Sequence, residues 1–130
     1  PPERRDPVSR VELTLPIELT NGNEGRSKHW APAHKRRREY ELEIRRAYPR
    51  PRKVKTPCRM TVTRVLRKGQ RRMDADSLGR GNAKEIIDAL VAVGFLPDDG
   101  PRHVVEVTYR QDDTARPDVG RTVVVMEAMP

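Results

Sequence analysis

Two aspartates that follow a basic run have the residue type and spacing of a catalytic or metal-binding pair. Residues 71–78 read RRMDADSL and place Asp74 and Asp76 one residue apart. In an extended chain alternate side chains share a face, with their Cβ atoms ~6.5 to 7 Å apart. Two carboxylates at that separation repel each other unless a cation lies between or beside them. Hard oxygen ligands of this kind suit Mg²⁺ or Mn²⁺, so the pair is a candidate metal site.

A lysine and two further aspartates follow in the next segment. The loop PDDG contains Asp98 and Asp99, and either could supply a third carboxylate. Lys84 lies on the first turn of the helix predicted before that loop and could offset charge on a phosphate. Plainer interpretations exist for each: DD before Gly is ordinary turn chemistry, and Lys84 could pair with Asp88 at i+4 on the helix surface.

Positive charge is concentrated in one stretch of the chain. Residues 26–72 hold 18 Lys and Arg against three Glu, a balance of +15, whereas the remaining residues hold nine against 16 acidic residues, a balance of −7. A basic half beside an acidic cluster suggests a polyanion held near a carboxylate site. The basic residues that flank the aspartate pair are the best candidates for contacts with a phosphate backbone. They are Arg67, Lys68, Arg71 and Arg72.

Strands and helices alternate along the predicted chain. Apolar alternation predicts strands at residues 11–19, 58–66, 102–111 and 121–127. In the first of these, Pro16 indicates an edge strand or a bulge. Helical spacing predicts one helix at about residues 33–48 and a second that ends near Val93. The order predicts an α/β (α+β) fold, with a small mixed sheet of about four strands and two main helices packed on it.

The second predicted helix has recognisable end signals. Asn82 with Glu85 three residues later resembles a capping box at its start. Gly94 followed by Phe95 fits a left-handed cap at its end, with an apolar contact behind it. This helix would therefore begin shortly after the aspartate pair and end shortly before the PDDG loop.

The size of the chain indicates one domain. We expect residues 1–9, rich in proline and charge, to be a flexible leader, and residues 10–130 to form the domain. The single cysteine, Cys58, cannot form an internal disulfide and is expected in the core; no Cys/His cluster has zinc-site spacing. No apolar run approaches the ~20 residues that cross a bilayer, and no secretory signal segment is recognisable. These features predict a cytoplasmic protein without a membrane partner.

The segments RRMDADSL and AKEIIDALVAVGFLPDD, followed by a Val-rich strand, resemble the signature of the RusA family of Holliday-junction resolvases. Family members carry an Asp-x-Asp-x-Leu segment after basic residues, a Lys-x-x-x-Asp-Ala-Leu helix and a Gly-aromatic-to-Asp-Asp loop. The matching positions here are Asp74, Asp76, Leu78, Lys84, Asp88, Ala89, Leu90, Gly94, Phe95, Asp98 and Asp99. Residues 79–82 are an insertion relative to shorter members, and Ser77 stands where many members have Asn.

The resemblance implies a RusA-like, Mg²⁺-dependent crossover junction endodeoxyribonuclease of DNA recombination and repair. Such enzymes are homodimers that bind four-way DNA junctions and nick two opposing strands, one per subunit. Carried over by position, Asp74, Asp76 and Asp99 would be the catalytic carboxylates and metal ligands, and Lys84 would be a catalytic or phosphate-contacting lysine. Two alternatives stay open: a nuclease acting on other branched or single-stranded DNA, and a non-catalytic basic DNA-binding module whose acidic cluster is a turn.

Overall fold

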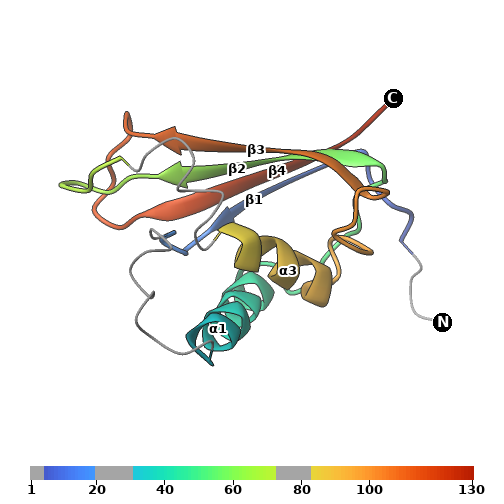
Figure 1. The fold of residues 1–130 in the computed structure, drawn as a ribbon, viewed down its shortest axis with the longest axis horizontal. Helices are drawn as coiled ribbons and strands as arrows, with labels where there is room; N and C mark the ends of the chain where they lie inside the picture. Colours follow the sequence, from blue (N-terminus) through green and yellow to red (C-terminus); the bar gives the residue numbers. More distant parts are fainter. Residues whose placement is uncertain (1–4, 20–30, 73–82) are drawn as a thin grey trace.

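A four-stranded sheet with two helices on one side makes up the described part of the chain (Figure 1). The computed structural model describes residues 5–19, 31–72 and 83–130. Within these ranges the elements are β1 (Arg10–Leu15), α1 (Ala31–Ala47), β2 (Cys58–Val65), α3 (Ala83–Val93), β3 (Val104–Asp112) and β4 (Arg121–Ala128). The predicted α+β fold with a mixed sheet and two helices is therefore confirmed.

The sheet is mixed because one of its three strand pairs is parallel. The strand order is β1-β4-β2-β3. β4 pairs antiparallel with both β1 and β2, whereas β2 and β3 run parallel. Parallel neighbours cannot be joined by a tight hairpin and need a crossover. Here the crossover contains α3, so the parallel pair determines on which side of the sheet α3 lies.

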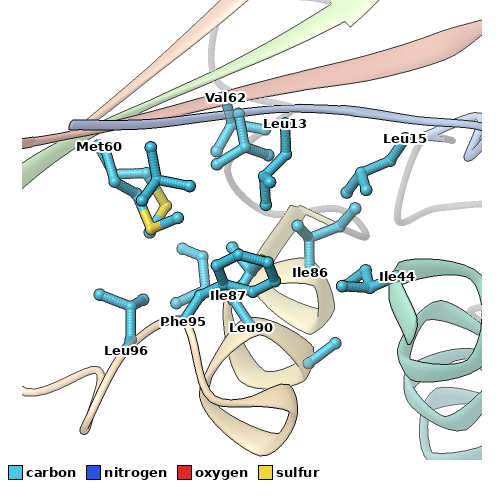
Figure 2. Close-up of a cluster of buried hydrophobic side chains, with 14 of the residues drawn as sticks. Leu13, Leu15, Ile44, Met60, Val62, Ile86, Ile87, Leu90, Phe95 and Leu96 are labelled. Atoms are coloured by element: carbon cyan, nitrogen blue, oxygen red, sulfur yellow. The ribbon is translucent and has the colours of Figure 1, made fainter. Parts of the chain in front are cut away.

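The core lies between the sheet and the helices (Figure 2). Alternate residues of the strands face the helices, as in Leu13 of β1 and Met60 and Val62 of β2. One face of α3 meets them through Ile86, Ile87 and Leu90. The fully buried strand residue Cys58 belongs to the same cluster, as predicted, and burial raises the pKa of its thiol.

The end of α3 has the predicted cap. Gly94 has a φ of 110°, a left-handed conformation that glycine adopts without a Cβ penalty. The N–H groups of Gly94 and Phe95 both donate to the carbonyl of Leu90, at 3.1 and 3.0 Å. Phe95 is buried, and its ring meets Tyr48 edge-on with centroids 6.2 Å apart. This cap directs the chain out of the helix into the loop that carries Asp98 and Asp99.

The first strand is shorter than the predicted range of residues 11–19. β1 ends at Leu15 because Pro16 has no N–H for the ladder. Ile17 and Leu19 stay buried, which explains why their apolar alternation looked like strand. Side chains replace the ladder there: Thr122 Oγ1 donates to the carbonyl of Ile17 at 2.7 Å, and a buried arginine donates to that of Leu19. β1 is an edge strand, as Pro16 indicated.

Backbone contacts begin before the expected domain boundary at Arg10. The N–H of Val8 donates to the carbonyl of Lys53 at 2.9 Å, and the N–H of Lys55 donates to the carbonyl of Val8 at 2.7 Å. The carbonyl of Ser9 accepts from the end of β4 at 2.8 Å. Val8 and Ser9, which the sequence placed in the leader, are therefore hydrogen-bonded to the domain, while residues 1–4 lie outside the described part. Neither described helix combines the length and apolar character needed to cross a membrane.

Candidate functional site

Lys84 lies between two carboxylates at the start of α3. Its Nζ is 3.8 Å from Oδ1 of Asp88, one turn further along the helix, and 3.8 Å from Oδ2 of Asp99, in the loop after the helix. The lysine side chain remains 69% exposed, so a ligand can reach it. The helix and its capped exit thus bring together two residues that are distant in sequence. The surface pair with Asp88 and the contact with Asp99 exist at the same time.

The two aspartates of the PDDG loop have different partners. Oδ1 of Asp98 accepts the N–H of Asp99 at 2.8 Å. That backbone hydrogen bond, followed by one to the Asp99 side chain, lowers the pKa of Asp98 from its ordinary value. Asp98 therefore stabilises its own turn, whereas Asp99 forms the ion pair with Lys84. Of the two aspartates that the sequence left open, Asp99 lies in the better position to act with the lysine.

Tyr109 on β3 borders the same site and was not singled out by the sequence. Its ring is half-buried and packs against the core. Burial raises the pKa of its phenol, and the nearby positive charge of Lys84 acts in the opposite direction. The phenol is therefore protonated at neutral pH and can donate a hydrogen bond. Its alternating position in the strand reads as ordinary core packing, so the pattern gave no functional signal.

The predicted aspartate pair lies outside the described residues. Asp74 and Asp76 fall in residues 73–82, as do Asn82 and the inserted residues 79–82. Among the described residues, no group of three or more His, Cys, Asp or Glu side chains could hold a metal ion. Asp99 offers carboxylate oxygens of the hard type that Mg²⁺ and Mn²⁺ prefer. A metal site of the expected composition therefore needs Asp74 and Asp76 together with Asp99.

A buried arginine fixes the backbone that leads to the aspartate pair. Arg64 on β2 is 5% exposed. Its Nη1 donates to the carbonyl of Arg71 at 3.2 Å and to Oε1 of Gln111 on β3 at 3.0 Å, and its Nε donates to the carbonyl of Leu19 at 3.0 Å. A buried guanidinium needs such acceptors. Arg71, three residues before Asp74 in the sequence, is thereby tied to a central strand of the sheet.

The basic loop after β2 is largely paired with acidic residues. Arg67 Nε is 2.9 Å from Glu18, Lys68 Nζ is 3.0 Å from Asp118, and Arg72 Nη1 is 3.3 Å from Asp113. Within the described residues, the fourth candidate, Arg71, has no ion pair. All three pairs are exposed, and exposed pairs contribute only ~0 to 1 kcal/mol. Phosphates of a polyanion can therefore compete for these cations.

The loop between β3 and β4 braces this basic loop. Arg116, with a φ of 46°, donates from Nε to the carbonyl of Asp113 at 3.1 Å and from Nη1 to the carbonyls of Arg67 and Gln70. The N–H of Lys68 donates to the carbonyl of Pro117 at 2.9 Å. The sequence had indicated only a polar turn here. The two loops form one surface, so the predicted phosphate contacts rest on a fixed backbone.

Comparisons with known proteins add no assignment to this geometry. No protein-family model matches the chain, and no curated protein matches it.

Proposed function

We propose that this chain is a metal-dependent endonuclease for branched DNA, with the four-way junction as its substrate. The observation that carries the proposal is the placement of Lys84 within 3.8 Å of Asp99. Both residues belong to the motif block that resembles the RusA family. A lysine and a carboxylate at one exposed site, preceded in the sequence by a segment with two further carboxylates, form a suitable set for phosphodiester hydrolysis.

Each residue at the site has a distinct proposed part in this reaction. Lys84 contacts a phosphate oxygen and offsets the negative charge that develops on it in the transition state. Asp74, Asp76 and Asp99 would hold the Mg²⁺ or Mn²⁺, which supplies Lewis-acid polarisation of the scissile phosphate. The protonated phenol of Tyr109, whose pKa is raised by burial and lowered in part by the charge of Lys84, is proposed as a further hydrogen-bond donor to the same phosphate. Together these groups bind, orient and neutralise the reacting centre.

The basic residues supply the binding energy in this proposal. Arg67, Lys68, Arg71 and Arg72 lie on one braced loop that leads directly to the aspartate pair. Contacts with phosphates make the affinity fall as salt rises, and they carry no sequence information. Recognition of a junction then comes from the shape and deformability of the DNA. We propose a homodimer acting in the cytoplasm, in which each subunit nicks one of two opposing strands.

Cleavage of a synthetic four-way junction tests the proposal. Wild type and Asp76→Asn are compared with Mg²⁺ and with EDTA, and a linear duplex of the same sequence serves as the second substrate. We expect wild type to nick the junction only with Mg²⁺, and Asp76→Asn to bind the junction equally without nicking it.

Two results would contradict parts of the proposal in different ways. If both proteins bind the junction and neither nicks it, the chain is a DNA-binding module and not an enzyme. If wild type nicks the linear duplex as fast as the junction, the chain is a nuclease without the proposed preference for branched DNA.

A further inference from the structure

The face of the sheet opposite the helices carries a regular row of charges. Read across β1, β4, β2 and β3, the residues directly opposite one another in register are Arg10, Glu127, Arg59 and Glu106. All four are exposed, and the residues next to them on β1, β4 and β2, which are Val11, Met126 and Met60, are buried in the core. On β3, Val105 next to Glu106 is 52% exposed, at the point where the β2–β3 register shifts. The row therefore reads plus, minus, plus, minus across the full width of the sheet. Within the described residues, Arg59, Glu106 and Glu127 form no ion pair.

The middle of this face carries short side chains. Four of its central positions are short β-branched residues, and in register they lie beside the charged row. They are Thr61, Thr63, Val123 and Val125, all half-buried. Both described helices lie on the other side of the sheet (Figure 1). A sheet face of short, β-branched side chains is of the kind that packs against another sheet.

The charge of this face does not suit a polyanion. Three rows of outward-facing residues cross the sheet in register, beginning at Arg10, Glu12 and Thr14 of β1. Together they hold three arginines and three glutamates, so this part of the face is neutral in a chain of net charge +8. The three arginines are Arg10, Arg59 and Arg110, and the three glutamates are Glu12, Glu106 and Glu127. A neutral surface of alternating sign is complementary to a second alternating surface, and not to a nucleic acid.

We infer that this face is the interface between two copies of the chain, related by a two-fold axis parallel to the strands. Rotation about such an axis reverses the order of the strands, so plus-minus-plus-minus faces minus-plus-minus-plus. Arg10 then faces Glu106 of the partner subunit, and Glu127 faces Arg59 of the partner subunit. Symmetry repeats both contacts and gives four opposite-charge pairs. A two-fold axis parallel to the row of charges would instead place each charged residue opposite the same residue of the other copy, so that like charges would face each other.

The inner positions agree with the same arrangement. In the next two rows, Val125 faces Thr61 of the partner subunit and Val123 faces Thr63 of the partner subunit, with no like charges opposed. Four strands ~4.8 Å apart and about eight residues of ~3.3 Å each give a face of about 500 Å² per copy. Two copies bury about 1,000 Å², at the lower end for specific interfaces, so we expect a dimer of micromolar stability.

Charge reversal tests this interface without any measurement of cleavage, so its outcome is independent of the proposed nuclease activity. Sedimentation velocity is measured for wild type, Arg59→Glu, Glu127→Arg and an equimolar mixture of the two variants. Each variant alone opposes like charges twice per dimer, and we expect dimerisation to weaken at least about tenfold. In the mixture all four contacts are opposite in sign, so we expect the dimer to return.

Arg59 and Glu127 are also neighbours within one sheet, so each substitution could weaken the fold as well as the interface. The mixture separates these two effects. Each variant chain keeps its own altered sheet in the mixture, and circular dichroism of each confirms that it is folded. A monomeric wild type would overturn the inference. Variants that dimerise as wild type does, or a mixture that stays monomeric, would equally show that the dimer does not use this face.

Discussion

Lys84 is held loosely enough to act on a substrate. Its two partners, Asp88 and Asp99, lie at 3.8 Å, and the lysine side chain is largely exposed. Exposed ion pairs of this kind contribute ~0 to 1 kcal/mol. The ammonium can therefore move to a phosphate at little cost, while the two carboxylates leave a local negative balance that attracts a cation.

Replacement of Lys84 is expected to slow cleavage without weakening DNA binding. In Lys84→Met the charge that offsets the developing negative charge on the phosphate is lost, and we expect kcat to fall on the order of 10² to 10³-fold. Arg46→Met is the matched control, because it removes one exposed positive charge from α1, outside the proposed site. Single-turnover nicking and junction affinity are measured for both. A loss of affinity with unchanged kcat would make Lys84 a binding residue only.

The pKa of Tyr109 responds to the charge of Lys84. Burial raises this pKa and the lysine charge lowers it. We therefore expect the Tyr109 pKa to rise further in Lys84→Met. Ultraviolet titration of wild type minus Tyr109→Phe isolates the phenol, and the same difference is taken in the Lys84→Met background.

The raised pKa of Tyr109 also determines how the free energy of unfolding changes with pH. A phenol with a raised pKa contributes stability that is present below its unfolded value of ~10 and lost as the pH rises through the folded value. Tyr109→Phe should therefore lose less stability than wild type in this alkaline range, as measured by urea unfolding. Equal losses, together with an unchanged pKa in Lys84→Met, would place Tyr109 outside the site.

At the level of elements, one buried side chain connects three segments. Arg64 on β2 holds the carbonyls of Leu19 and Arg71 and the side chain of Gln111. Leu19 is the last residue of the described range 5–19, and Arg71 is the second-last of the range 31–72. In the sequence, Arg71 is followed closely by the aspartate pair. β2 is a central strand of the sheet, so Arg71 is attached to a rigid element.

Loss of the Arg64 guanidinium is expected to destabilise the fold. Arg64→Met keeps the buried stem but removes the donor from the carbonyls of Leu19 and Arg71, each loss costing ~1 to 3 kcal/mol, so we expect a total loss of about 3 kcal/mol. Urea unfolding measures it, with Arg46→Met expected to change stability by less than ~0.5 kcal/mol. A change for Arg64→Met no larger than the control would mean that these hydrogen bonds do not hold the loops.

The elements that the sequence predicted best are those with local signals. Gly94 and Phe95 mark the end of α3 through their own conformational and apolar preferences. The range of β1 was too long because burial continues at Ile17 and Leu19 after the backbone ladder has ended. The parallel pairing of β2 with β3 was not predicted, because apolar alternation is the same in parallel and antiparallel strands.

The candidate site was only partly predictable for a related reason. Lys84 and Asp99 were both named from the motif block, but their proximity depends on the helix length and on the turn at Gly94. Tyr109 and the brace from Arg116 depend on strand and loop pairing that spacing does not reveal. Asp74 and Asp76 remain predictions, since they lie outside the described residues.

At the scale of the whole molecule, the two kinds of surface have separate proposed uses. The neutral sheet face would pack against a second copy, while the braced basic loop and the Lys84–Asp99 pair stay available to DNA. This separation would let a chain of net charge +8 form the proposed dimer without opposing its basic surfaces. Each dimer would then carry two sites, as cleavage of two opposing strands requires.

The Mg²⁺ dependence of four-way-junction nicking tests most directly whether Asp99 helps to hold the metal of the proposed nuclease site. Wild type, Asp99→Asn and Asp6→Asn are titrated with Mg²⁺, the last removing an exposed carboxylate remote in sequence from the motif block. We expect Asp6→Asn to match wild type, and Asp99→Asn to need more Mg²⁺ and to reach a lower maximal rate. Nicking by Asp99→Asn with the wild-type Mg²⁺ dependence, or nicking by wild type in EDTA, would contradict a metal-dependent nuclease at Lys84 and Asp99.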